Sequence, residues 1–553
     1  MNKQTIITLL LAFVVIAGQA QTQTSALIRG RIVNLPEWAR NQLTIDYYNP
    51  LQAYFPTWLP LQLDSLRRFE VEVPMTDISP VDIVYKWFLL KPGETYDVEL
   101  DGESIRLTSS GGEGSLTNEV LNHEPAVCDV DFFNMKDKTD AFVMDAAEKE
   151  LKRLEAANDS ILKANPNLSQ QWREYAENNA LASLADELVQ RYFTKPSVRQ
   201  STDGKLWQWL HDNFICRLHR PYSLFGERLG YIMLFYVKEL LDPRTRSDLN
   251  LRGFDTAIGI ALETSSKPSK GGENGDLKTL RTMLQEYKAL VESDVPDSVL
   301  TSHPFVEAAE KLYTEPYFKE LFKSGVVSER TTAEDIKRVA SLDMPEDVRD
   351  YARAVLLYSE MEQYHAPLRP ALLNLVNEVK DDGFRKLILE QDKHYRDLAK
   401  QTDEKSLMPN EPLAGLTDGK DIFEKIVEPF RERFVYVDVW GTWCGPCKLD
   451  LQMNTKALHK ALADLPVTYL YLCNGSPADA WRSTIAEYQL TGEHSTHYNL
   501  PAVQQSAVEQ YIGVRGFPTY RIITPDGTII KDDVPRPGNP EAVRKRMLEL
   551  MNK

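Results

Sequence analysis

Hydrophobic and polar positions alternate over short distances in the first part of the chain. Apolar or alternating runs are broken there by turn residues such as Pro92-Gly93. We predict strands at residues 27–33, 43–48, 69–73, 83–90 and 96–100. Strands of this length with no helical spacing between them are typical of an all-β domain. The pattern therefore predicts a small antiparallel β-sandwich over residues 21–115.

The period changes after the glycine-rich segment at residues 111–114. Apolar residues then recur at intervals of three and four, which is the spacing of a helix with one buried stripe. Besides a first helix around residues 143–161, this spacing predicts helices at residues 172–193, 231–241, 277–291, 304–322 and 348–364. The region has no fixed repeat length, glycine-rich phosphate loop or nucleophile elbow. We predict a helical domain over residues 116–406, with His365 and His394 isolated on helices.

A third pattern follows a short linker that we place at residues 407–412. Two apolar runs rich in β-branched and aromatic residues, at residues 434–439 and 467–473, indicate buried strands. Helical spacing occurs at residues 448–462, 478–488 and 541–550. Strands that alternate with helices predict an α/β domain over residues 407–553.

Two cysteines lie where the first of these strands meets the next helix. Cys444 and Cys447 enclose Gly445 and Pro446, so the first cysteine falls at the helix N-terminus and the second about one turn later. The unpaired amides and the positive dipole end of a helix stabilise a thiolate, and only the thiolate attacks a disulfide. We therefore expect Cys444 to attack and Cys447 to resolve the mixed disulfide.

A zinc site and a structural disulfide are the alternatives for these two cysteines. Zinc requires a second pair of Cys or His ligands at matching spacing. The best candidates are His494 and His497, which lie much later in a segment that we interpret as a polar loop. The pattern favours redox chemistry, so we expect neither a metal nor another cofactor.

The stretch from Met408 to the C-terminus resembles the TlpA/ResA type of thioredoxin-fold proteins, the membrane-side or secreted thiol-disulfide oxidoreductases of bacteria. Cys444 and Cys447 fall on the family's nucleophilic and resolving cysteines, and Trp443 falls on the tryptophan before them. Asp438 falls on the buried acid of thioredoxin. The resemblance implies that Asp438 relays the proton of Cys447, because burial disfavours a charged carboxylate. The alternative is a strand-end aspartate bonded to the backbone.

A second element of this resemblance is the segment at residues 516–520. It falls on the family's cis-proline loop, which implies that Pro518 packs against the disulfide and that the Phe517 backbone pairs with an extended substrate. The alternative is an ordinary trans proline that opens a strand. The β-rich region with its Pro92-Gly93-Glu94 turn is similar to a domain of unknown function that often precedes TlpA-like domains.

Two positions depart from the family pattern. ResA-like members usually carry glutamate and then proline shortly after the second cysteine, where this chain has Asp450 and Gln452. Asp450 is therefore either a carboxylate that moves protons beside the thiols or a plain exposed helix residue.

The first residues have the features of a secretory signal. A lysine precedes an apolar run at residues 6–17, and small residues precede Gln21. The run is short for a membrane span, which needs about 20 residues, and no cysteine follows it to serve as a lipid anchor. We predict a signal peptide at residues 1–20 and a mature protein in the periplasm or outside the cell, without membrane insertion.

Composition narrows the class of protein. The chain has 553 residues, of which 42% are hydrophobic and 26% charged, which indicates several globular domains. Its net charge of -17 argues against nucleic acid or an anionic membrane as a partner.

Five cysteines are too few for a disulfide scaffold. Cys473 is expected to be an inert core thiol, and Cys128 and Cys216 to pair or to stay buried.

Together these features predict a thiol-disulfide oxidoreductase that reduces disulfides of envelope proteins. Gly-Pro between the cysteines resembles reducing thioredoxins, and reduction in an oxidising compartment requires an upstream membrane thiol donor. The β and helical domains would position a protein substrate over Cys444 or mediate formation of a homo-oligomer. The alternatives are a disulfide isomerase and an envelope binding protein whose thioredoxin-like domain is a scaffold or redox sensor. Thr442 stands at the wrong spacing from Cys444 for a peroxidase.

Overall fold

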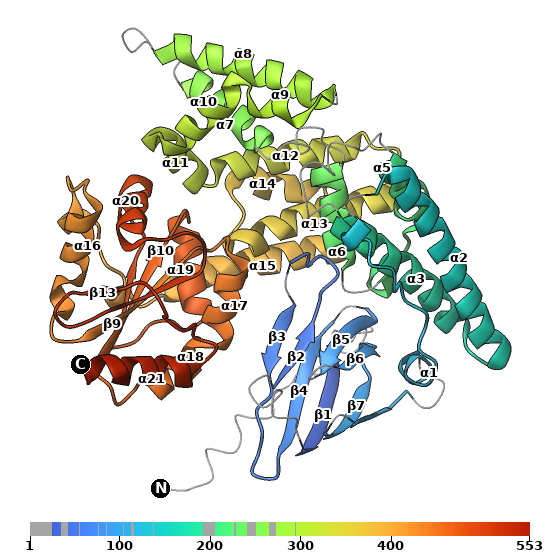
Figure 1. Ribbon diagram of the computed structural model, residues 1–553. Helices are drawn as coiled ribbons and strands as arrows, with labels where there is room; N and C mark the ends of the chain where they lie inside the picture. Colours follow the sequence, from blue (N-terminus) through green and yellow to red (C-terminus); the bar gives the residue numbers. More distant parts are fainter. Residues whose placement is uncertain are drawn as a thin grey trace, which may run out of the picture.

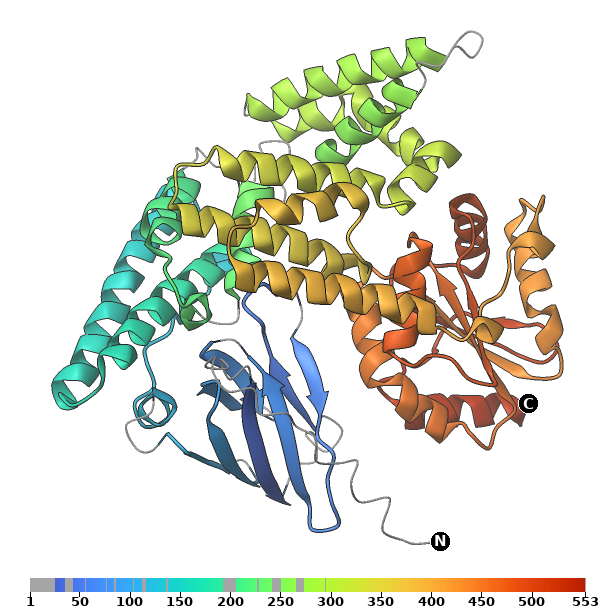
Figure 2. The same cartoon turned by 180° about the vertical axis from the view of Figure 1, so that it is seen from behind.

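The computed structural model describes residues 25–34, 43–54, 56–75, 77–83, 86–102, 104–111, 116–135, 138–191, 205–225, 228–240, 250–264, 273–293 and 295–552. The signal peptide that we predict at residues 1–20 lies outside these ranges. The described elements form a β-rich part, a helical part and a C-terminal α/β part, in that order along the chain (Figure 1). The same arrangement is seen from behind in Figure 2.

Two four-stranded sheets make up the β-rich part. Their strand orders are β4-β1-β7-β8 and β3-β2-β5-β6. Both sheets contribute to one hydrophobic core, in which Ile28, Ile45 and Val81 are fully buried. The strands are β1 (Ser25–Asn34), β2 (Thr44–Tyr47), β3 (Thr57–Pro60), β4 (Arg68–Pro74), β5 (Ser79–Ile83), β6 (Lys86–Leu90), β7 (Thr95–Asp101) and β8 (Ser104–Ser109).

Two details of this part differ from the sequence prediction. The expected antiparallel pairing is wrong for β1 and β7, which run parallel. The intervening chain forms the second sheet and β4 before it returns beside β1, and such a long crossover permits parallel pairing. The single strand expected at residues 83–90 is instead the end of β5 together with β6, which pair antiparallel. Apolar residues occur in both strands, so the local pattern did not separate them.

The helical part is organised around α13, most of whose residues are buried. Its helices are α1 (Leu116–Asn122), α2 (Asp140–Ala164), α3 (Gln170–Gln190), α5 (Lys205–Asn213), α6 (Leu229–Phe235), α7 (Leu251–Thr264), α8 (Glu273–Glu292), α9 (Asp297–Thr301), α10 (Pro304–Thr314), α11 (Pro316–Lys323), α12 (Val326–Ala340), α13 (Glu346–Tyr364), α14 (Pro370–Leu375) and α15 (Asp382–Gln401). The one helix expected at residues 304–322 is two, because Pro316 cannot continue α10 and instead opens α11.

The C-terminal part is a five-stranded sheet in the order β11-β10-β9-β12-β13. Strands β9, β10 and β11 are parallel, and β12 is antiparallel to β9. Its strands are β9 (Phe434–Trp440), β10 (Val467–Cys473), β11 (Ser495–Tyr498), β12 (Thr519–Ile523) and β13 (Ile529–Ile530). Its helices are α16 (Gly419–Val427), α17 (Gly445–Met453), α18 (Thr455–Ala461), α19 (Ala478–Glu487), α20 (Ala502–Ile512) and α21 (Pro540–Met551). Short helical turns in the described part of the whole chain are η2 (Phe133–Met135), η4 (Ile215–Arg217), η5 (Tyr222–Phe225), η6 (Tyr236–Leu240), η8 (Val376–Glu378), η9 (Glu404–Ser406), η10 (Glu411–Leu413) and η11 (Glu428–Phe430).

Helices cover both faces of this sheet, so β9 is buried along its whole length. Successive side chains of a strand point to opposite faces. Val435 and Val437 face the core with α16 and α20, whereas Tyr436 and Trp440 face the core that contains both cysteines. Asp438 lies two residues from both Tyr436 and Trp440 in this strand, so its side chain points to the same face as theirs. Its carboxyl therefore points toward the face with the cysteines.

Three local expectations for this part are corrected. The helix expected at residues 448–462 breaks at Asn454, whose backbone ends α17 and begins α18. The linker expected at residues 407–412 joins the sheet edge, since Leu407 forms a bridge with His497. His497 itself is not in a loop: it lies in β11, fully buried, with Nε2 3.1 Å from the carbonyl oxygen of Leu490.

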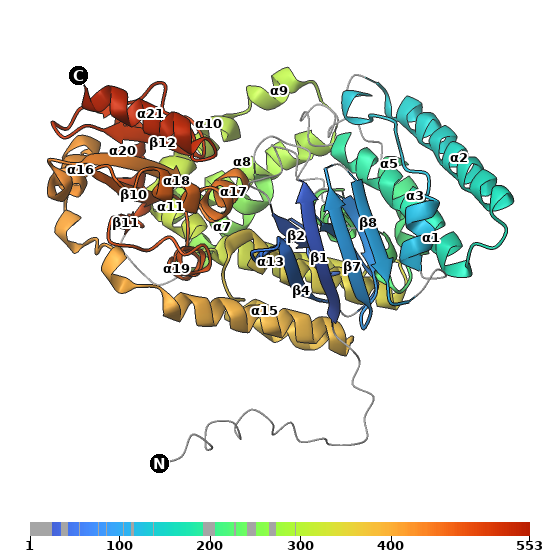
Figure 3. The same cartoon turned by 90° about the horizontal axis from the view of Figure 1, so that it is seen from below.

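The C-terminal part packs against the helical part through two helix pairs. Helix α15 lies along α19, and α11 contacts α20; the long α15 is seen along its length in Figure 3. Within the described residues, no helix has the length and hydropathy that crossing a membrane requires.

Candidate functional site

Cys444 and Cys447 form a disulfide at the beginning of α17, with their Cα atoms 5.3 Å apart. Cys444 is the N-cap residue of this helix, and its sulfur accepts a hydrogen bond from the amide of Cys447 at 3.2 Å. After reduction, the same amide and the dipole of α17 would stabilise a thiolate on Cys444. Both cysteines are largely buried, at 4% and 1% exposure, so the approach to them depends on the residues around them.

Trp443 and Phe517 border the disulfide. Trp443 is 40% exposed, and its ring meets that of Phe517 edge to face at a centroid distance of 5.1 Å. The Trp443 indole nitrogen donates to the carbonyl of Asn474 at 3.1 Å. Gly441 leaves room for this ring, because a Cβ atom there would lie 2.6 Å from Trp443 Nε1 and the ring would have to shift. The peptide bond between Phe517 and Pro518 is cis.

Asp438 is buried in the core that contains the two cysteines. Its exposure is 4%, and its Oδ1 atom has no hydrogen-bond partner within the described part of the chain. Burial raises the pKa of Asp438 well above its usual value; the charge of Asp450 adds to this and Arg536 opposes it. A pKa that is raised from that of an ordinary carboxyl toward that of a thiol favours proton exchange between Asp438 and a cysteine in the same core.

Asp450 belongs to a hydrogen-bonded network and not to the exposed face of α17. Its carboxylate accepts hydrogen bonds from the Tyr520 hydroxyl at 2.7 Å, from Arg536 at 2.6 Å and from the Asn454 amide at 2.9 Å. The alternative of a plain exposed helix residue is therefore wrong, since its exposure is 6%. The network joins α17, β12 and the segment before α21.

Lys448 directly follows Cys447 and connects α17 to the helical part. Its ammonium group donates to the backbone carbonyls of Glu362 and Gln363, at 3.1 and 3.4 Å, at the end of α13. Burial lowers the pKa of Lys448 to about 8, while Glu362 and Glu487 act in the opposite direction. This contact is not predictable from the local sequence, because nothing in the pattern around Lys448 marks it as buried.

The other three cysteines are free. Cys473 is fully buried in β10, and burial raises the pKa of its thiol to about 12. Burial likewise raises the pKa of Cys128 to about 12. Cys216 is exposed, contrary to the expectation that it would pair or stay buried, and its sulfur lies 3.4 Å from His211 Nε2. A thiol with a raised pKa is a poor nucleophile at neutral pH, because little of it is present as the thiolate.

His365 is not isolated, as the sequence pattern suggested. It ends α13 with a left-handed backbone, and its ring lies 3.3 Å from both the Tyr488 hydroxyl and the Glu487 carboxylate. His394 lies 3.9 Å from the other oxygen of Glu487. In the described part of the chain, no group of three or more His, Cys, Asp or Glu side chains is placed to hold a metal ion.

Solved structures of bacterial thiol-disulfide oxidoreductases are similar to part of this chain. No family model matches the chain, and no curated protein matches it. A provisionally assigned thiol-disulfide oxidoreductase of Bacteroides vulgatus is 26% identical, and the match covers 23% of this chain and 78% of that one, with a TM-score of 0.20. The thioredoxin domain of a Bacteroides vulgatus thiol-disulfide oxidoreductase is 18% identical. This match covers 22% of this chain and 83% of that one, with a TM-score of 0.20. A thiol:disulfide interchange protein of a Bacteroides species is also 18% identical. This match covers 23% of this chain and 78% of that one, with a TM-score of 0.20.

Proposed function

We propose that this protein is a secreted or periplasmic thiol-disulfide oxidoreductase that reduces disulfides of envelope proteins. The observation that carries the proposal is the Cys444–Cys447 disulfide at the N-terminus of α17. The cis bond before Pro518 and the buried acid Asp438 support it. Localisation rests on the N-terminal sequence alone.

The proposed reaction is an exchange of one disulfide for another. The Cys444 thiolate attacks a substrate disulfide, forms a mixed disulfide and releases one substrate thiolate. The Cys447 thiol then loses its proton, for which Asp438 is the proposed acceptor, and attacks the Cys444 sulfur. The second substrate thiol leaves, so two electrons have passed from the protein to the substrate. A membrane thiol donor would return the Cys444–Cys447 disulfide to the dithiol.

Trapping the mixed disulfide tests this sequence of steps. In a Cys447→Ser variant the second attack cannot occur, so we expect a covalent adduct with native, disulfide-bonded insulin that dithiothreitol releases. Peptide mapping should place the adduct on Cys444. The matched control is Cys216→Ser, which removes an exposed cysteine outside the C-terminal part and should accumulate no adduct. An adduct mapped to Cys216, or none at all, would contradict the proposal.

The alternative is a binding protein whose redox domain serves as a scaffold or sensor. This alternative is supported by a cavity at the junction of the three parts of the chain, which could hold a binding partner. A binding protein would hold its partner equally well after both Cys444 and Cys447 are replaced by serine, and would form no covalent adduct in the trapping experiment.

A further inference from the structure

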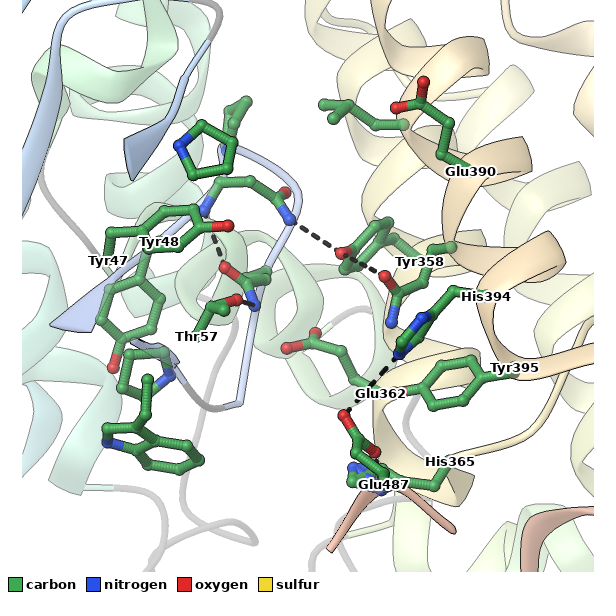
Figure 4. A pocket seen from close by; sticks show the side chains of 18 of the residues that line it. Tyr47, Tyr48, Thr57, Tyr358, Glu362, His365, Glu390, His394, Tyr395 and Glu487 are labelled. Carbon is green, nitrogen blue, oxygen red and sulfur yellow. Dashed lines mark hydrogen bonds and ion pairs between the residues drawn. The ribbon is translucent and has the colours of Figure 1, made fainter. Parts of the chain in front are cut away.

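A cavity of about 700 Å³ lies between the β-rich, helical and C-terminal parts. We call it the interdomain cavity. Figure 4 shows Tyr47, Tyr48 and Thr57 of the β-rich part on one side, and residues of α13, α15 and α19 on the other. Its volume falls in the range of about 300–1,000 Å³ that is typical of ligand sites.

The wall from the β-rich part is fixed to α13 by hydrogen bonds. The Ala53 amide donates to the Glu362 carboxylate at 2.8 Å, and the Asn49 side chain donates to the Tyr358 hydroxyl at 2.8 Å. Tyr351 also donates to the carbonyl of Pro50 at 2.8 Å. These contacts join residues far apart in the sequence, so the cavity is a formed feature of the fold and not a loose gap.

Helix α17, which begins at the disulfide, supplies part of the lining of the cavity. Lys448, Leu449 and Gln452 of α17 line the cavity, and Lys448 directly follows Cys447. Leu449 is 47% exposed. A polypeptide held in the interdomain cavity would therefore lie beside the helix that carries the reactive cysteines.

The charge of the lining favours a cation. Three glutamates, Glu362, Glu390 and Glu487, line the cavity with two lysines, Lys386 and Lys448, and Lys448 already binds two backbone carbonyls. Of its two histidines, His365 adds no positive charge at neutral pH, since burial lowers its pKa to about 3. The ring of His394 lies 3.9 Å from the Glu487 carboxylate.

The remaining lining adds aromatic faces. Tyr358, Tyr395 and Tyr488 lie beside these carboxylates, as Figure 4 shows for the first two. Aromatic rings attract ammonium and guanidinium groups through their negative faces. Glu487 Oε2 has no hydrogen-bond partner within the described residues, although His365 Nδ1 lies 3.3 Å away. That oxygen is itself enclosed, but the Glu487 side chain as a whole is 31% exposed and lines the cavity, so its carboxylate is placed to accept from an N–H donor there.

We propose that the interdomain cavity binds a segment of the substrate polypeptide that carries a lysine or arginine close to the cysteine to be reduced. This proposal rests on the proposed reductase function and specifies its substrate. The β-rich and helical parts would then select among disulfides that the two cysteines alone would not distinguish.

Short synthetic peptides with one cysteine, blocked as a mixed disulfide with thionitrobenzoate, test the proposal. One series carries lysine at roughly two to six residues from the cysteine, or about 7–20 Å of extended chain; matched series carry glutamine or glutamate there. The full-length protein is first reduced with dithiothreitol and desalted, so that each molecule supplies one pair of electrons. The rate of release of coloured thionitrobenzoate is then measured.

We expect the best lysine peptide to react about fivefold faster than its glutamine counterpart, and the glutamate peptide to react slowest. In Glu487→Gln this ratio should fall toward one, whereas Glu424→Gln, which changes an exposed carboxylate on α16, should keep it. Equal rates for the three series, or a preference for glutamate, would overturn the proposal. If wild-type protein reduced none of the peptides, the reductase function itself would fail, which is a distinguishable result.

Discussion

Replacement of Cys444 by serine is expected to lower the rate of disulfide reduction about a thousandfold or more. A serine hydroxyl is not ionised at neutral pH and cannot replace a thiolate as the attacking group. The structure places Cys444 at the N-cap of α17, where a thiolate would be stabilised. The measurement is the rate at which pre-reduced protein reduces insulin disulfides.

The control for this variant is Cys473→Ser, which changes a buried free cysteine in the same domain. It should keep most of the activity if the protein remains folded, as judged by its circular dichroism. Retention of a large part of the wild-type rate by Cys444→Ser would show that another group attacks the substrate, and would contradict the assignment.

Asp438→Asn is expected to slow resolution of the mixed disulfide about a hundredfold, which is a typical contribution of a general acid-base group. Asparagine has nearly the same shape but cannot accept the proton that Cys447 must lose. The mixed disulfide should therefore persist, and rapid acid quenching followed by mass spectrometry would measure its lifetime. Asp532→Asn, at an exposed position, is the matched control. An unchanged lifetime in Asp438→Asn would rule out the relay.

The same variant has an expected effect on stability with a definite sign. Because burial raises the pKa of Asp438 in the folded protein, the folded state holds a proton that the unfolded chain releases above about pH 4. Protonated Asp438 therefore makes its full contribution to the free energy of unfolding below about pH 4, and this contribution is lost as the pH rises toward the folded-state pKa. An asparagine side chain does not titrate, so Asp438→Asn should gain thermal stability relative to wild type as pH rises through this range. Calorimetry at a series of pH values would measure it.

Local patterns were sufficient to predict much of the C-terminal fold. The apolar run at residues 434–439 matches β9, and the run at residues 467–473 matches β10. The strict alternation of a strand also places Asp438 on the face that bears the cysteines. The break of the helix at Asn454 was missed, because the apolar spacing continues across it.

Contacts between distant parts of the chain could not be predicted. Lys448 binds carbonyls at the end of α13, and His365 meets Glu487 and Tyr488 of the C-terminal part. In the local sequence these residues have the pattern of an exposed helix, since burial by another domain leaves no periodic trace. The interdomain cavity depends on such contacts, so no local pattern indicates it.

The reduction potential of the Cys444–Cys447 pair is the measurement that tests the reductase assignment most directly. The purified protein would be equilibrated against dithiol and glutathione buffers, and the fraction of disulfide would be measured by alkylation and mass spectrometry. A potential near or below about -250 mV, close to that of thioredoxin, is the expected result. A potential of about -120 to -180 mV, the range of oxidases and isomerases, would contradict it and indicate a protein that forms or rearranges disulfides.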